Sequence, residues 1–232
     1  MEKIGNSPKK IEKRGHNSYN SRLLTLIFLS FIVFPLFSGC QLISSAVILI
    51  HGTDEKPPCP VKMQGKVAVL CWTDPSITYT DSENASAVGA QLNRKIASKL
   101  GKKNKITMIS QQEVNNRLDN YPDNITGEQD LIEIAKDLEA DYLIGVYLMS
   151  FDYQKGVGIY QGSASYAVSL IDGKTGELVY ENQNNPPYVY PPNRTVSTDV
   201  TNDNQFRREY ISRLAERIGW EFYPHDRYDM DI

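Results

Sequence analysis

The sequence predicts an α/β domain built on a single mixed β-sheet of about five strands, with helices packed on it. Residues 66–72 and 141–149 are continuous apolar runs, a pattern typical of strands that are covered on both faces. Residues 163–171 instead alternate apolar with small, mostly polar side chains, and the glycine-bearing turn 172–176 leads back into 177–182. A hairpin beside covered strands makes the predicted sheet mixed.

Helical periodicity fills the intervals between these strands. Apolar side chains recur at steps of three and four between positions 85 and 100, which predicts a helix with one buried stripe. Capping boxes at 110–113 and 126–129 predict the starts of two short helices, the first of them after a short strand at 106–109. The last helix is expected at 203–223, before Pro224.

The first 39 residues have the layout of a secretory signal peptide. Six Lys and Arg residues precede an apolar block at 23–37, which closes on the small residues Ser38 and Gly39 before Cys40. The block has 15 residues, which suits a signal peptide better than a membrane span of about 20 residues. An uncleaved transmembrane helix is the alternative.

The end of this block, Leu-Phe-Ser-Gly-Cys at 36–40, resembles a bacterial lipobox. The resemblance implies that Cys40 becomes the acylated first residue of the mature chain and anchors it to a membrane leaflet. Gln41 follows the cysteine, and by resemblance to proteobacterial sorting rules it implies an outer-membrane lipoprotein that faces the periplasm. An inner-membrane or surface-exposed position stays open.

Cleavage before Cys40 leaves 193 residues, which suit one domain with a sizeable core. Residues 40–65 contain three prolines and are expected to form the lipid anchor and an extended linker. The periplasmic α/β domain is expected at 66–225. Residues 226–232 are expected to be a flexible tail.

Charge and motifs exclude several classes of function. Loss of residues 1–39 removes six Lys and Arg residues and two acidic ones, so the formal net charge changes from −3 to −7. A chain this acidic is not expected to bind nucleic acid. The sequence has neither a GxGxxG nor a GxxxxGK[ST] loop, so no nucleotide cofactor is expected.

Cys59 and Cys71 are the cysteines that remain once Cys40 carries lipid. They could form a disulfide in an oxidising compartment, or stay free thiols because Cys71 lies in a predicted buried strand. Neither their spacing nor that of His225 with the acidic tail is typical of a metal site, so no metal is expected.

Two stretches contain candidate site residues. Asp74 follows the first strand at its carboxyl end, where open α/β sheets place ligands, although solvation of a loop is the simpler explanation. Residues 184–202 form a long irregular connection that contains Tyr188, Tyr190, Pro191 and Pro192. These four could contact a partner protein, or the segment could be a strap that delivers the last helix.

The order of elements and three sequence stretches resemble a periplasmic module found in curli-secretion lipoproteins of the CsgG type, in penicillin-binding-protein activators of the LpoB type and in the amino-terminal domain of TolB. The stretches are 67–70, 135–145 with its Ala-Asp-Tyr before a strand, and 170–179. The CsgG type adds long membrane-inserting hairpins. The one candidate insertion here, 152–162, is too short, so a relative without transmembrane hairpins is expected.

The sequence shows no nucleophile and base at a useful spacing, so we expect no enzyme activity. The predicted function is a non-catalytic, lipid-anchored envelope protein whose module binds a partner protein in an assembly, secretion or cell-wall complex. A homo-oligomer is compatible with this prediction. The alternative is a periplasmic hydrolase or small-ligand receptor that uses the loop 73–80.

Overall fold

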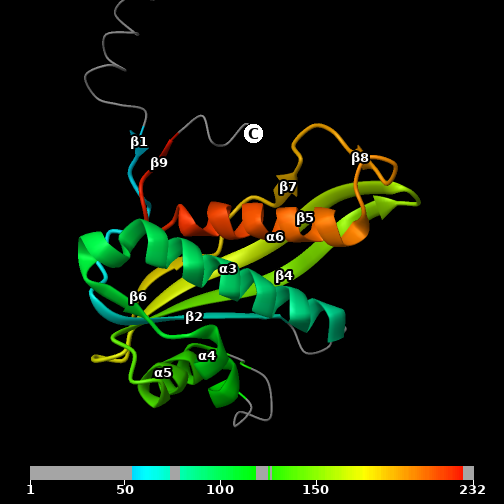
Figure 1. The fold of residues 1–232 in the computed structure, drawn as a ribbon. Coiled ribbons are helices and arrows are strands. Elements are labelled where there is room, and N and C mark those ends of the chain that lie inside the picture. Colours follow the sequence, from blue (N-terminus) through cyan, green and yellow to red (C-terminus); the bar gives the residue numbers. More distant parts are fainter. Residues whose placement is uncertain (1–53, 74–78, 119–124, 126, 227–232) are drawn as a thin grey trace, which may run out of the picture. The chain divides into compact units, whose positions relative to one another are not determined.

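The computed structural model describes residues 54–73, 79–118, 125 and 127–226. A mixed sheet with the strand order β3-β2-β4-β5-β6 forms their centre, and two short strands, β7 and β8, also pair with β5 (Figure 1). The strands are β2 (Gly65–Thr73), β3 (Ile106–Met108), β4 (Tyr142–Gly156), β5 (Ile159–Asp172), β6 (Glu177–Asn182), β7 (Tyr188–Tyr190) and β8 (Val196–Ser197). The predicted α/β fold with a mixed sheet is confirmed.

Helices cover both faces of this sheet. The helices are α3 (Tyr79–Asn104), α4 (Gln111–Leu118), α5 (Glu128–Asp137) and α6 (Asp203–Gly219). The long helices α3 and α6 lie side by side on one face, and the short helices α4 and α5 lie on the other (Figure 1). In the part of the chain described by the structure, no helix combines the length and apolar character needed to cross a membrane.

Strand β4 is the central strand, as its apolar sequence predicts. It runs parallel to β2, from the pair Val67–Tyr142 to the pair Thr73–Leu148, and antiparallel to β5 on its other side. Both β4 and β5 extend well beyond the predicted strands and meet in a hairpin near Gly156 and Ile159. The sheet therefore contains one long hairpin that reaches past the end of β2.

The larger core lies between the sheet and the pair α3 and α6. Val88, Leu92 and Ile96 of α3 are fully buried in it, as the predicted apolar stripe requires. The smaller core lies under α4 and α5 and includes Val114 and Ile134. The alternation of side chains along β4 sends Ile144 and Val146 to the larger core and Leu143 to the smaller one.

Side-chain caps fix two of the helix starts. The Glu113 N–H donates to Ser110 Oγ at 3.2 Å, and the Gln205 N–H donates to Asn202 Oδ1 at 2.9 Å. The capping box predicted at 126–129 is wrong, because α5 starts at Glu128 with Gly127 as an N-cap that makes no side-chain hydrogen bond. The last helix ends at Gly219, four residues before the predicted end.

The linker prediction for 40–65 differs from what the structure shows over 54–65. Strand β1 (Asp54–Glu55) pairs with β9 (His225–Asp226), and the Cys59 N–H donates to the Glu221 carbonyl at 3.0 Å. Cys59 and Met63 are buried in the larger core. Residues 54–65 therefore pack on the domain, and Asp226, predicted to lie in the tail, is part of β9.

Cys59 and Cys71 are both buried, and neither forms a disulfide. This corresponds to the second alternative from the sequence, in which the two remain free thiols. Burial raises the pKa of the Cys59 thiol, and it raises that of Cys71 further. Both thiols are therefore protonated at neutral pH and pack as small apolar groups.

Asp141 joins the starts of β2 and β4. Its carboxylate accepts hydrogen bonds from the Lys66 N–H at 2.7 Å and from Lys174 Nζ at 2.8 Å. The bond from Lys174, followed by that from the Lys66 N–H, lowers the pKa of Asp141. A lowered folded-state pKa stabilises the fold above the unfolded value of about 3.9, and this stabilisation is lost as the pH falls through the folded-state pKa.

Asp141→Asn is therefore expected to lower the free energy of unfolding by about 1 kcal/mol at neutral pH. The difference from the wild type should shrink as the pH falls below about 3.9 and vanish once the pH is below the lowered folded-state pKa of Asp141. Urea unfolding at a series of pH values measures both effects. Glu133→Gln, at an exposed position of α5, is the control and should cost little at any pH. An Asp141→Asn deficit that persists unchanged in acid would contradict the assigned role of the charge.

Candidate functional site

The predicted site residues fall into two groups. Cys40 and Asp74, together with most of the loop 73–80, lie outside the described residues. The four strap residues are described: Tyr190 and Pro191 are buried, and Tyr188 and Pro192 are half-buried. Tyr188 stacks on Tyr210 of α6, with ring centroids 6.3 Å apart and planes 2° apart. These contacts correspond to the packing alternative, in which the segment straps the last helix to the sheet.

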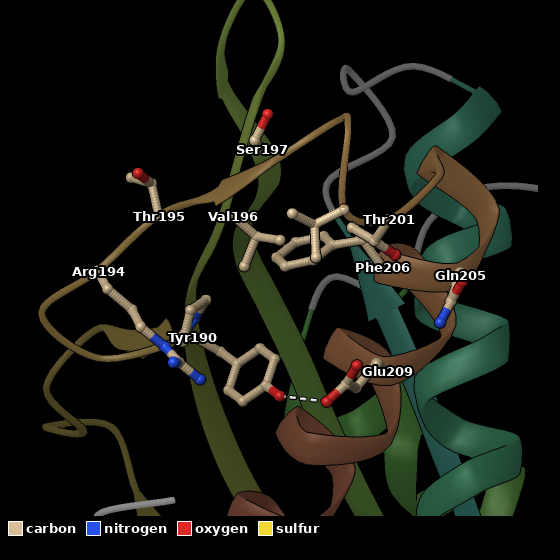
Figure 2. Close-up of a pocket in the computed structure, with 11 residues that line it drawn as sticks. Tyr190, Arg194, Thr195, Val196, Ser197, Thr201, Gln205, Phe206 and Glu209 are labelled. Carbon is tan, nitrogen blue, oxygen red and sulfur yellow. Dashed lines mark hydrogen bonds between the residues drawn. The ribbon is translucent and has the colours of Figure 1, made fainter.

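A cavity of about 390 Å³, the strap pocket, lies between the strap and the first turns of α6. Figure 2 shows Tyr190 and Glu209 pointing toward each other across it, and the Tyr190 hydroxyl donates to a Glu209 carboxylate oxygen. Arg194 reaches toward the same pair from the strap (Figure 2). The carboxylate is thus already engaged, and the remaining polar groups of the pocket come from the segment 194–201 and from Gln205 in the first turn of α6.

A second cavity, the sheet groove, has a volume of about 370 Å³ and lies on the opposite face of the sheet. Its apolar wall is formed by side chains from four strands and α5, namely Trp72, Leu131, Tyr147, Met149, Ala167 and Leu178. The rings of Trp72 and Tyr147 stack with centroids 5.7 Å apart. Met149 is 42% exposed at the rim, so apolar side chains remain accessible here.

The groove exists because α4 and α5 are too short for the strands that they cover. Helix α5 has 10 residues and spans about 15 Å, whereas β4 has 15 residues and spans about 50 Å. The 26-residue helix α3 spans about 39 Å on the other face. The cover predicted for 66–72 and 141–149 is present at 67–71 and 143–146, whereas Trp72 and Tyr147 are half-buried and Met149 is exposed.

The charged side chains that line the groove are both acidic. Glu128 belongs to the first turn of α5, where the helix dipole stabilises a carboxylate. Glu181 stands on β6 and accepts a hydrogen bond of 2.5 Å from Gln183 Nε2. An aromatic pair flanked by two carboxylates suits a segment that combines apolar side chains with a Lys or Arg, because the ring faces and the carboxylates both attract cations.

Sequence reasoning missed the groove residues. Trp72 and Tyr147 occur in apolar runs, where nothing local separates a covered aromatic ring from an accessible one. The available signal was the mismatch between long apolar strands and the short helices predicted to start at 110–113 and 126–129. Among the described residues, no group of three or more His, Cys, Asp or Glu side chains is arranged to hold a metal ion.

No protein-family model matches this chain, and no curated protein matches it. Among solved structures it is similar to the PelC dodecamer of Paraburkholderia phytofirmans, with 13% identity and a TM-score of 0.39 over 72% of this chain and 94% of that one. Lipoprotein GNA1162 of Neisseria meningitidis has 9% identity and a TM-score of 0.40, over 67% of this chain and 98% of that one.

The LpoB C-terminal domain of Salmonella enterica is also similar, with 14% identity and a TM-score of 0.31 over 56% of this chain and 84% of that one. The resemblance to LpoB-type proteins that the sequence stretches suggest thus recurs among the similar structures. The likeness to CsgG-type proteins and to TolB stays a prediction. At these identities and TM-scores the similarities carry no argument about function.

Proposed function

We propose that this chain is a non-catalytic, lipid-anchored protein of the bacterial envelope, and that its α/β domain binds a partner protein through the sheet groove. The observation that carries the proposal is the accessible Trp72–Tyr147 pair on a sheet face that α5 leaves open. The bound part of the partner is a segment that carries apolar side chains beside a Lys or Arg. The lipobox-like ending at Cys40 supports the anchor.

Two features of the groove favour binding of a partner protein over catalysis of a reaction. Its wall is formed largely by ring, aliphatic and thioether groups, which suit the burial of partner side chains. Its two carboxylates come from different elements, α5 and β6, and the hydrogen bond from Gln183 already engages Glu181. A basic side chain of the partner segment would offset part of this negative charge as the segment covers the apolar wall.

Site-specific photo-crosslinking in intact cells tests this proposal. A photoreactive amino acid at Met149 is expected to crosslink one envelope protein, through a peptide of that protein that contains Lys or Arg. The control position is Val200, which is 78% exposed on the segment between β8 and α6. Crosslinks of the same partner from both positions would contradict binding at the groove.

Charge reversal supplies the second arm of the test. The double variant Glu128→Lys and Glu181→Lys should reduce the Met149 crosslink by about tenfold or more, because two attractive contacts become repulsive. The matched control reverses Glu133 and Glu177, which are exposed residues of α5 and β6 outside the groove lining. Mass spectrometry of the mature amino terminus checks the anchor separately, and an unmodified Cys40 would overturn that part of the proposal.

A further inference from the structure

Two segments that lie far apart in the sequence bring lysines together at one end of the domain. Segment 56–66 has three lysines, segment 99–105 has four, and neither contains Asp or Glu. The segments are in direct contact, because the Gly65 N–H donates to the Lys105 carbonyl at 3.3 Å and Gly65 pairs with Ile106 in the β2–β3 ladder. The lysines therefore gather where β2 begins and α3 ends.

All seven lysines are exposed. Six of them form what we call the lysine end: Lys56, Lys62, Lys99, Lys102, Lys103 and Lys105. The seventh, Lys66, forms an ion pair with Glu139 at 3.3 Å. The dipole of α3 explains lysines in its last turn, since cations are stabilised at a helix C-terminus. It does not explain Lys56 and Lys62, which come from the proline-containing segment packed beside it.

The anchored part of the chain enters the domain at this same end. Strand β1 precedes Lys56 directly, and the Cys59 N–H donates to the Glu221 carbonyl. Tyr223, two residues after Glu221, contacts the end of α3, because Lys99 Nζ lies 5.8 Å from the centroid of its ring. Fourteen residue steps separate Cys40 from Asp54, at most about 50 Å of extended chain. A lipid on Cys40 would therefore keep the lysine end within reach of the bilayer.

We propose that the lysine end docks on the anionic phospholipid headgroups of the leaflet that holds the acyl anchor, which rests on the lipid anchor of the proposed function. The mature chain has a net charge of −7, so a cluster of six lysines opposes the charge of the whole molecule. Each lysine near an anionic surface contributes on the order of a fivefold preference for it, within a Debye length of about 10 Å.

Docking at this end would keep the Trp72 end of the sheet groove away from the lipid. Strand β2 begins beside the lysine end at Gly65 and contributes Trp72 to the groove at its other end. Seven residue steps of strand separate the two positions, or about 23 Å. The membrane contact and the partner contact thus use opposite ends of the same strand.

Chemical acetylation of lysines on vesicles tests the docking. The full chain is expressed in cells that can process Cys40, and the purified protein is then reconstituted into lipid vesicles. Amine acetylation, quantified by mass spectrometry for each lysine, is compared between phosphatidylcholine vesicles and vesicles that also contain phosphatidylglycerol. Labelling of the lysine end should slow by about fivefold on the anionic vesicles and recover in about 1 M NaCl. Lys155, exposed at the far end of the β4–β5 hairpin, should label equally on both.

The variant Lys99→Gln, Lys102→Gln, Lys103→Gln, Lys105→Gln should abolish the vesicle dependence of Lys56 and Lys62 labelling. The matched control removes four exposed charges elsewhere, Arg117, Lys136, Lys155 and Arg208, and should retain it. Equal labelling of the lysine end on both vesicles, with Cys40 acylated, would overturn the docking and leave the proposed function intact. Absence of acylation on Cys40 would overturn the anchor and the docking together.

Discussion

Replacing Tyr210 by alanine is expected to lower the free energy of unfolding by about 4 kcal/mol, because it removes a fully buried aromatic ring from the larger core. The ring packs against Phe151, at a centroid distance of 5.0 Å, and against Tyr188 and Phe206 at 6.3 and 6.4 Å. Truncation therefore leaves a cavity between α6, β4 and the strap. Urea unfolding followed by circular dichroism measures the loss.

Tyr210→Phe is the control for this prediction, and it separates the ring from the hydroxyl. The Tyr210 hydroxyl is buried and has no hydrogen-bond partner in the structure, so removing it relieves a desolvated polar group. The phenylalanine variant is expected to be at least as stable as the wild type. A phenylalanine variant as unstable as the alanine variant would mean that the hydroxyl, rather than the ring, holds α6 in place.

Replacing Gly173 by alanine is expected to destabilise the domain by about 3 kcal/mol. A Cβ at this position would lie 2.0 Å from the Ala140 carbonyl oxygen, and a backbone atom cannot swing away as the tip of a side chain can. The Gly173 N–H also donates to the Asp141 carbonyl at 2.9 Å, so the turn after β5 is held tightly against the start of β4. Thermal and urea unfolding both measure the effect.

Gly156→Ala is the matched control, because a Cβ there meets no atom within 4 Å. Gly156 is the last residue of β4, at the end of the β4–β5 hairpin that is far from Gly173. The control should change the free energy of unfolding by less than about 0.5 kcal/mol. Equal destabilisation by the two variants would contradict the close approach at Gly173.

Local pattern was sufficient for the helices α3 to α6, for the strands β2 to β6 and for their order, but not for the short strands β1, β7, β8 and β9. The apolar run at 141–149 predicts a central strand, and β4 has neighbours on both sides. The glycine-bearing turn 172–176 predicts the antiparallel return, and β6 pairs with β5 as expected. These predictions succeed because side-chain period and turn chemistry act over a few residues, which a sequence displays directly.

The ends of the helices and the segments that pack onto the core were less predictable, because they depend on residues that are distant in sequence. The capping box at 126–129 has the right residue types, yet α5 starts with Gly127 as its N-cap. The proline segment reads as a linker, yet Cys59 and Met63 find a place in the core. The strap residues Tyr188 and Tyr190 fit either a partner contact or a packed strap in the sequence, and in the fold they pack against α6 and β5.

By itself the sequence determined the α/β class and the mixed sheet, because both depend on short-range order along the chain. The resemblance of 36–40 to a lipobox stays a prediction. Only the tertiary structure decided which surfaces stay open. A helix advances about 1.5 Å per residue and a strand about 3.3 Å, so α5 leaves the Trp72–Tyr147 pair accessible. Strand pairing likewise brought 56–66 against 99–105, which no local pattern relates.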